Sequence, residues 1–221
     1  TLARVFSMIS TEELEQAFLS WITAITDKVK DVVAIDGKTI RRSYDTSSNK
    51  NAIHMVSAWA SKNKMVLGQV KTDEKSNEIT AIPELLHLLE IEDCIVTIDA
   101  MGCQKEIATD IVNKNADYVL ALKRNQDGLY KEVYDLFQDA QETNFNGLEW
   151  DYFETDEKNH GRHEIRRYWT ITDVEHLAHG QDWPQLRSVG MVELECTSQG
   201  ETTHDFRFYI NSLDGQAETF A

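Results

Sequence analysis

Two aspartates interrupt the apolar strands that the sequence predicts, and both are candidates for metal chemistry. Asp36 follows Val-Val-Ala-Ile and precedes a glycine, and Asp99 follows Ile-Val-Thr-Ile and precedes Ala-Met-Gly. A carboxylate at the end of a buried strand costs several kcal/mol unless a partner compensates its charge. On neighbouring strands, spaced about 4.8 Å, two such side chains would lie roughly 5–7 Å apart. Their mutual repulsion favours a divalent cation between them.

Mg²⁺ (or Mn²⁺) is the cation that two such carboxylates suit. Mg²⁺ takes oxygen ligands and keeps several waters. Two ions roughly 3.5–4 Å apart can activate a water or hydroxyl and stabilise the leaving oxygen of a phosphodiester. In open α/β sheets the ligand crevice lies beyond the carboxyl ends of strands, where Asp99 is expected. The alternative is that each aspartate caps a turn or helix, as Asp99 before Gly102 could.

Three other motifs imitate functional sites and are rejected on spacing or context. Asp36-Gly-Lys-Thr39 ends like a phosphate-binding loop, but that motif requires a glycine where Val32 stands. His160-Gly-Arg-His-Glu164 lacks further metal-binding partners, and a polar turn entering a strand is the simpler interpretation. Cys103 has no evident catalytic base, so we do not expect a nucleophile there.

Basic residues follow two of the predicted strand ends, although the chain as a whole is acidic. They are solvated surface or, next to a metal site, contacts for a phosphate backbone; these residues are Lys38, Arg41, Arg42, Lys123 and Arg124. Lys and Arg number 22 against 38 Asp and Glu, a net charge of −16, and residues 135–221 alone hold 18 acids and 6 bases. This balance argues against a free-standing nucleic-acid binder, because phosphate contacts need cations.

Hydrophobic periodicity predicts the elements that would position these residues. Helices are expected at 11–25, 79–89, 104–115 and 129–139, and strands at 31–39, 53–61, 65–72, 94–99 and 118–123. The strand at 31–39 reads as buried on both faces. Pro83 is expected only in the first turn of its helix. An antiparallel trio followed by alternating strands and helices predicts an α/β, RNase H-like mixed sheet with flanking helices.

After about residue 140 the pattern changes to extended segments rich in Tyr, Trp, Val and Thr. They lie at 150–154, 163–172, 187–196 and 203–211. We interpret them as a mainly antiparallel β region, either a small second domain or an insertion. The predicted organisation is a helical lead-in at 1–30, an RNase H-like catalytic core at 31–140 and an acidic β-rich insertion at 141–221.

Composition is that of an ordinary globular protein. With 221 residues, 41% of them apolar and 27% charged, wholesale disorder is excluded. No apolar run approaches the ~20 residues that span a bilayer, and no secretory signal is visible. Three cysteines without CxxC spacing favour a reducing cytosol. The first residue is Thr1 rather than Met, which suggests a piece of a longer protein.

Four segments in this order resemble the H-repeat-associated proteins, bacterial insertion-sequence transposases of the DDE type. They are Val33–Ser43, Lys75–Leu85, Thr97–Gln104 and Ala121–Gln126. The resemblance covers nearly the whole chain. It implies an RNase H-like core that nicks and joins DNA at element ends with Mg²⁺. It carries the first two acidic positions of the family onto Asp36 and Asp99.

The family's third acid is a glutamate on a helix after the β insertion, in a segment resembling His-Trp-x-Ile-Glu-Asn. The resemblance places it beyond Ala221, and Glu164 is the one in-chain substitute considered. The expected function is therefore that of a DDE transposase fragment in the bacterial cytoplasm, with a homodimer left open. Cleavage and strand transfer would involve no covalent protein–DNA intermediate. The alternatives are an inactive remnant acting only as a folded binding or structural domain, and an RNase H-like nuclease with other substrates.

Overall fold

The computed structural model describes residues 4–5, 7–25, 32–40, 43, 53–72, 78–159 and 161–221. They form two compact units, Thr1–Cys94 and Ile95–Ala221. The boundary between these two units, at Cys94 and Ile95, therefore lies inside the predicted core of residues 31–140. The predicted division into a helical lead-in, a catalytic core and an insertion, at residues 30 and 140, stays a prediction.

Three antiparallel strands form the sheet of the first unit. They are β1 (Val32–Thr39), β2 (His54–Ala60) and β3 (Met65–Lys71), with β2 in the middle. Alternation turns Ile35, Val56 and Ala58 to the buried face and Asp36 to the exposed face. The predicted hairpin is confirmed. The expectation that β1 is buried on both faces is wrong, because every second residue from Asp36 onward faces solvent.

Two helices belong to this unit, α2 (Thr11–Ile25) and α3 (Glu78–Leu88). Helix α3 covers the buried face of the sheet, and Gly68 of β3 lets it come close. Side-chain carbons of Leu85 and Leu89 lie 3.2 and 3.1 Å from the point where a Cβ on Gly68 would stand. Pro83 is the sixth residue of α3 and so lies in its second turn, not in the first as expected. It removes one helical hydrogen bond, and the complete burial of Leu85 on the sheet compensates that loss.

The second unit begins with a parallel strand pair joined by a helix. Its elements are β4 (Ile95–Ile98), the 3₁₀-helix η1 (Ala100–Gly102), α4 (Lys105–Asn113), β5 (Asp117–Leu122), the 3₁₀-helix η2 (Arg124–Gln126) and α5 (Asp127–Glu142). The predicted strands and helices of this stretch are confirmed to within three residues at each end. The order of elements in both units is that of an α/β, RNase H-like fold with a mixed sheet and flanking helices.

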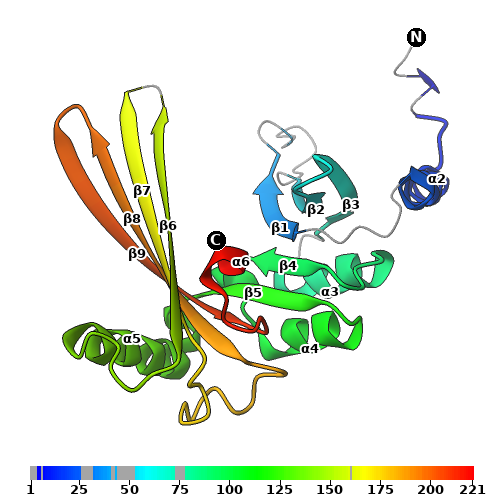
Figure 1. The fold of residues 1–221 in the computed structure, drawn as a ribbon. Coiled ribbons are helices and arrows are strands. Elements are labelled where there is room, and N and C mark those ends of the chain that lie inside the picture. The colour runs from blue at the N-terminus through cyan, green and yellow to red at the C-terminus, as the bar shows by residue number, and fades with distance from the viewer. Residues whose placement is uncertain are drawn as a thin grey trace. The chain divides into compact units, whose positions relative to one another are not determined.

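The acidic region then forms a long antiparallel meander, which we call the ribbon (Figure 1). Its strands are β6 (Trp150–Asn159), β7 (Arg162–Ile171), β8 (Ser188–Ser198) and β9 (Glu201–Asn211), followed by α6 (Ala217–Phe220). Strand β9 also pairs antiparallel with β5, so the ribbon continues the sheet of the second unit. Of the two interpretations left open, this pairing favours an insertion over a separate second domain.

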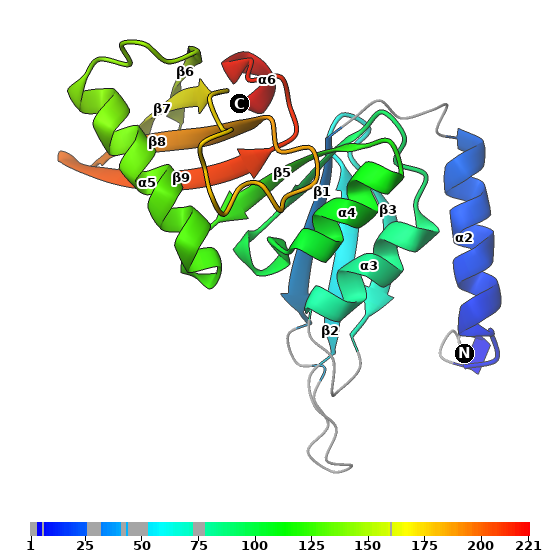
Figure 2. The same ribbon diagram turned by 90° about the horizontal axis from the view of Figure 1, so that it is seen from below.

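Helices cover both faces of β9 near its junction with β5 (Figure 2). Phe208 packs against the aromatic rings of α5, with ring centres 5.9 Å apart for Phe137. The next residue, Tyr209, points to the other face and meets Phe220 of α6 at 5.4 Å. Within the described ranges, no helix is long and apolar enough to cross a membrane.

Candidate active site

Asp99 directly follows β4 and caps η1. Its Oδ1 accepts the backbone N–H of Met101 at 3.0 Å and that of Gly102 at 3.4 Å. The residue is exposed, and its Oδ2 contacts no donor among the residues that the structure describes. The cap interpretation of Asp99 is confirmed as a structural role. It holds one carboxylate oxygen with two N–H groups and leaves the other without a donor among the described residues.

Two side-chain amides tie the segment after β5 to the segment after β4. Asn125 donates from Nδ2 to the carbonyl oxygen of Ala100 at 2.6 Å. Gln126 donates from Nε2 to the carbonyl oxygen of Cys103 at 2.9 Å. Because β4 and β5 are parallel, both segments lie at the carboxyl edge of the sheet, where ligands bind in open α/β folds. We call Asn125 and Gln126 the amide clamp.

The amide clamp joins η2 to η1, the 3₁₀-helix that Asp99 caps, and two predicted basic residues lie next to it in the chain. Lys123 and Arg124 directly precede it in the chain, and both are exposed. Neither forms an ion pair within the described part of the chain, so their charges are available to an anionic ligand. Sequence reasoning did not assign a role to Asn125 or Gln126. The available signal was that both lie just past a strand end, in a segment that carries the family resemblance.

Asp36 lies inside β1 rather than at its end, three residues before Thr39. It pairs across the sheet with Ser57, whose hydroxyl accepts a hydrogen bond from Gln69 Nε2 at 3.0 Å. The Asp36 carboxylate is exposed and has no hydrogen-bond or ion-pair partner among the described residues. Asp36 does not stabilise the strand, because aspartate has a low propensity for β structure.

Of the three remaining basic residues that are candidates for DNA contact, the structure describes one. Lys38 lies two residues after Asp36 on the same exposed face of β1. Arg41 and Arg42 lie outside the described residues. Asp36 belongs to the first unit and Asp99 to the second. That the two carboxylates meet across neighbouring strands stays a prediction.

The donor set fits a hard divalent cation. Both aspartates are exposed, and each offers at least one carboxylate oxygen that the described residues do not occupy. Mg²⁺ is held in proteins by one or two carboxylates with water completing its shell. In the described ranges, no three His, Cys, Asp or Glu side chains gather into a metal cluster.

Glu164 is a poor substitute for a third acid. It lies within β7, where its carboxylate is bound by Arg166 at 2.5 Å and faces Arg162 at 4.0 Å. It pairs with Glu157 and Cys196 in the outer half of the ribbon, away from the carboxyl edge of β4 and β5 (Figure 1). Arginines already neutralise the Glu164 carboxylate, and Glu164 lies in the outer half of the ribbon. It is therefore not placed to join Asp99 in the proposed metal site.

Two of the motifs that imitate functional sites lie in the second unit. The first, His160-Gly-Arg-His-Glu164, leads from the β6–β7 turn into β7, as interpreted, although His160 itself lies outside the described residues. Cys103 is fully buried, and burial raises the pKa of its thiol to about 12. A thiol with that pKa is protonated at neutral pH, so it is not a nucleophile.

Burial also predicts how the three cysteines react. In the native protein at pH 8, Cys196 should be labelled by a thiol reagent, because it is half-buried on the ribbon. Cys94 and Cys103 are buried and should be labelled only after unfolding. Mass spectrometry after brief exposure to iodoacetamide measures this. Equal labelling of Cys103 and Cys196 would contradict the described packing around η1.

The chain belongs to the family of transposase DDE domains, whose family model matches residues 27–221. It is similar to the H repeat-associated protein YhhI of Escherichia coli K12, with 42% identity over 228 residues. That alignment covers 100% of this chain and 59% of YhhI. The H repeat-associated protein YbfD of the same strain is 46% identical over 175 residues, which cover 79% of this chain and 68% of YbfD. The chain thus spans about three fifths of the length of YhhI.

Among solved structures, the chain is similar to a piggyBac transposase synaptic complex with hairpin DNA. The TM-score is 0.41 at 9% sequence identity, and the match covers 83% of this chain and 33% of that one.

Proposed function

We propose that this chain carries the first two acids, Asp36 and Asp99, of a DDE transposase that cuts and joins DNA at the ends of an insertion sequence. The observation that carries the proposal is Asp99 at the carboxyl edge of β4. One of its oxygens accepts from backbone N–H groups and the other has no partner among the described residues. Lys123 and Arg124 directly precede the amide clamp, which binds the residues that follow Asp99.

In this proposal each residue has a separate task. Asp36 and Asp99 hold Mg²⁺ or Mn²⁺, and the bound ion supplies the Lewis acidity that activates the attacking oxygen and stabilises the leaving oxygen. Lys123 and Arg124 hold the phosphate backbone beside Asp99, and Lys38, Arg41 and Arg42 do so beside Asp36. The η1 cap keeps the Asp99 carboxylate in one orientation, so that little ordering is required when the ion binds.

The finer assignments follow from the same hypothesis. The relatives are longer than this chain, and we expect the third acid in a stretch corresponding to residues beyond Ala221. We place the protein in the bacterial cytoplasm, where DNA is its substrate and where three free cysteines stay reduced. A homodimer would let two active sites act on two element ends.

Metal titration tests the proposal. Mn²⁺ binding to the chain, followed by calorimetry or by loss of the free-ion electron paramagnetic resonance signal, should weaken at least tenfold in Asp36→Asn and in Asp99→Asn. Asp135→Asn is the matched control, because Asp135 is an exposed aspartate on α5 and is not part of the proposed site. Equal Mn²⁺ binding by the wild type and all three variants would remove the metal assignment.

A further inference from the structure

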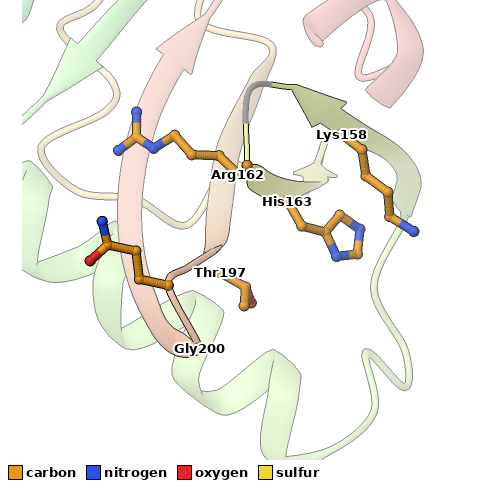
Figure 3. Close-up of a pocket in the computed structure, with 7 residues that line it drawn as sticks. Lys158, Arg162, His163, Thr197 and Gly200 are labelled. Carbon is orange, nitrogen blue, oxygen red and sulfur yellow. The ribbon is translucent and has the colours of Figure 1, made fainter.

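A hollow of about 420 Å³ lies at the outer end of the ribbon, where the β6–β7 and β8–β9 turns stand side by side. Figure 3 shows the residues that line it, Lys158, Gly161, Arg162, His163, Thr197, Gln199 and Gly200. None of these lining residues is acidic. That is unexpected in a region where acids outnumber bases by 18 to 6.

Ion pairing explains why the hollow is basic. Four of the six basic residues in 135–221 each have a carboxylate oxygen within 3.2 Å, and these residues are Arg166, Arg167, Arg187 and Arg207. The other two are Lys158 and Arg162. Lys158 has no ion pair within the described ranges, and the carboxylate nearest to Arg162 is 4.0 Å away. Lys158, which has no ion pair among the described residues, and Arg162, whose ion pair with Glu164 is the longest of the region at 4.0 Å, therefore line the same hollow.

The strand register places these groups on both sides of the ribbon end. Lys158, His163 and Thr197 are paired directly across β6, β7 and β8, so they share one face. Arg162 is paired with Ser198 and points to the opposite face, as Figure 3 shows. On the first face His163 also contacts Asp156, with Nε2 and Oδ1 2.7 Å apart. A ligand at this end meets a cation on either face.

The two turns keep the end of the ribbon open. Gly161 and Gly200 have φ of 80° and 87°, which favours glycine, and the space where a Cβ would stand on either is empty. Backbone at these turns is thus accessible beside the side chains of Thr197 and Gln199. Gln199 adds an amide donor, and Thr197 adds a hydroxyl that also shares a hydrogen bond with the Thr202 hydroxyl at 2.8 Å. Cations, a hydroxyl and an amide around an open hollow match the oxygens of a phosphate group.

We propose that the ribbon end is a phosphate-binding site that contacts the DNA backbone outside the reaction centre. Lys158 and Arg162 supply the charge, and Thr197 and Gln199 donate to phosphate oxygens. The proposal rests on the proposed function, because a transposase presents DNA to this surface. It reconciles a net charge of −16 with a DNA substrate, since the acidic ribbon pairs Arg166, Arg167 and Arg207 closely with carboxylates, while Lys158 and Arg162 lie at its end.

DNA binding without metal tests this site separately from the metal centre. Fluorescence anisotropy of a labelled duplex in EDTA should show about tenfold weaker binding by Lys158→Ala/Arg162→Ala at low salt. The slope of log K against log salt should fall by about 2, as expected for two lost phosphate contacts. Lys158→Glu/Arg162→Glu should weaken binding further. Arg187→Ala is the control, because Arg187 is exposed but paired with Asp214 at 2.7 Å, and it should bind DNA as the wild type does.

Two further measurements identify the ligand and separate the hypotheses. Inorganic phosphate at millimolar concentration should compete weakly, because a single phosphate lacks the neighbouring phosphates of a DNA strand. The proposal is overturned if the Ala double variant binds DNA as tightly as Arg187→Ala does, or if phosphate alone displaces the duplex at micromolar concentration. Mn²⁺ affinity should be unchanged in the Ala double variant, so loss of this site leaves the metal assignment standing, and the reverse also holds.

Discussion

Asp99→Asn should lower metal-dependent DNA cleavage by the full-length protein about 10³-fold while leaving the fold intact. The loss corresponds to about 4 kcal/mol of transition-state stabilisation, of the size expected when a metal ligand is removed. The fold survives because an asparagine Oδ1 can accept the same N–H groups of Met101 and Gly102 that Asp99 accepts at 3.0 and 3.4 Å. Cleavage of end-sequence DNA in Mn²⁺ measures the first effect, and urea denaturation measures the second.

Asp99→Ala separates the two roles of this carboxylate. Alanine removes the metal ligand and the cap together, so cleavage should fall as in Asp99→Asn while the free energy of unfolding falls by about 1 kcal/mol. Asp36→Asn should lose cleavage to a similar extent without loss of stability, because Asp36 has no partner in the described part of the first unit. If Asp99→Asn cleaves like the wild type, Asp99 is a cap and nothing more.

The sequence identifies candidate site residues, but it does not reveal the contacts that hold them. Asp36 and Asp99 stand out because a charge interrupts an apolar run, and that signal is local. The amide clamp joins Asn125 to Ala100, 25 positions apart, through one side chain and one carbonyl, which no periodicity reveals. The position of Pro83 within its helix was predicted wrongly for a related reason. Helix propensity alone does not include the burial of Leu85, which compensates for the hydrogen bond that Pro83 removes.

The four strands of the ribbon were likewise predictable from the sequence, whereas the pairing of the ribbon with the core sheet was not. Alternating aromatic and β-branched residues predicted each strand, but pairing partners depend on contacts between distant positions. The pairing of β9 with β5 brings Phe208 opposite Leu122, across 86 positions of the chain. The patterns of 141–221 alone were therefore compatible with a separate domain or an insertion, and this pairing favours the insertion.

Phe208→Ala should lower the free energy of unfolding by about 3–5 kcal/mol, because it opens a cavity where the ribbon joins the core. Phe208 is 4% exposed, and its ring lies 5.8, 5.7 and 5.9 Å from the ring centres of Tyr130, Tyr134 and Phe137 of α5. Urea denaturation followed by tryptophan fluorescence measures the loss. Phe206→Ala is the control, since Phe206 lies on the same strand and face but is 48% exposed, and its removal should cost under 1 kcal/mol.

The form of the unfolding transition decides between an insertion and a domain. Because β9 pairs with both β5 and β8, the ribbon and the carboxyl edge beside Asp99 share one sheet, and Phe208→Ala should unfold them in a single transition at lower denaturant. Tryptophans of the ribbon and circular dichroism of the helices should then report the same midpoint. Two separate transitions in the variant, with the helices melting later, would mean that the ribbon folds independently of β4 and β5, the strands that precede Asp99 and the amide clamp.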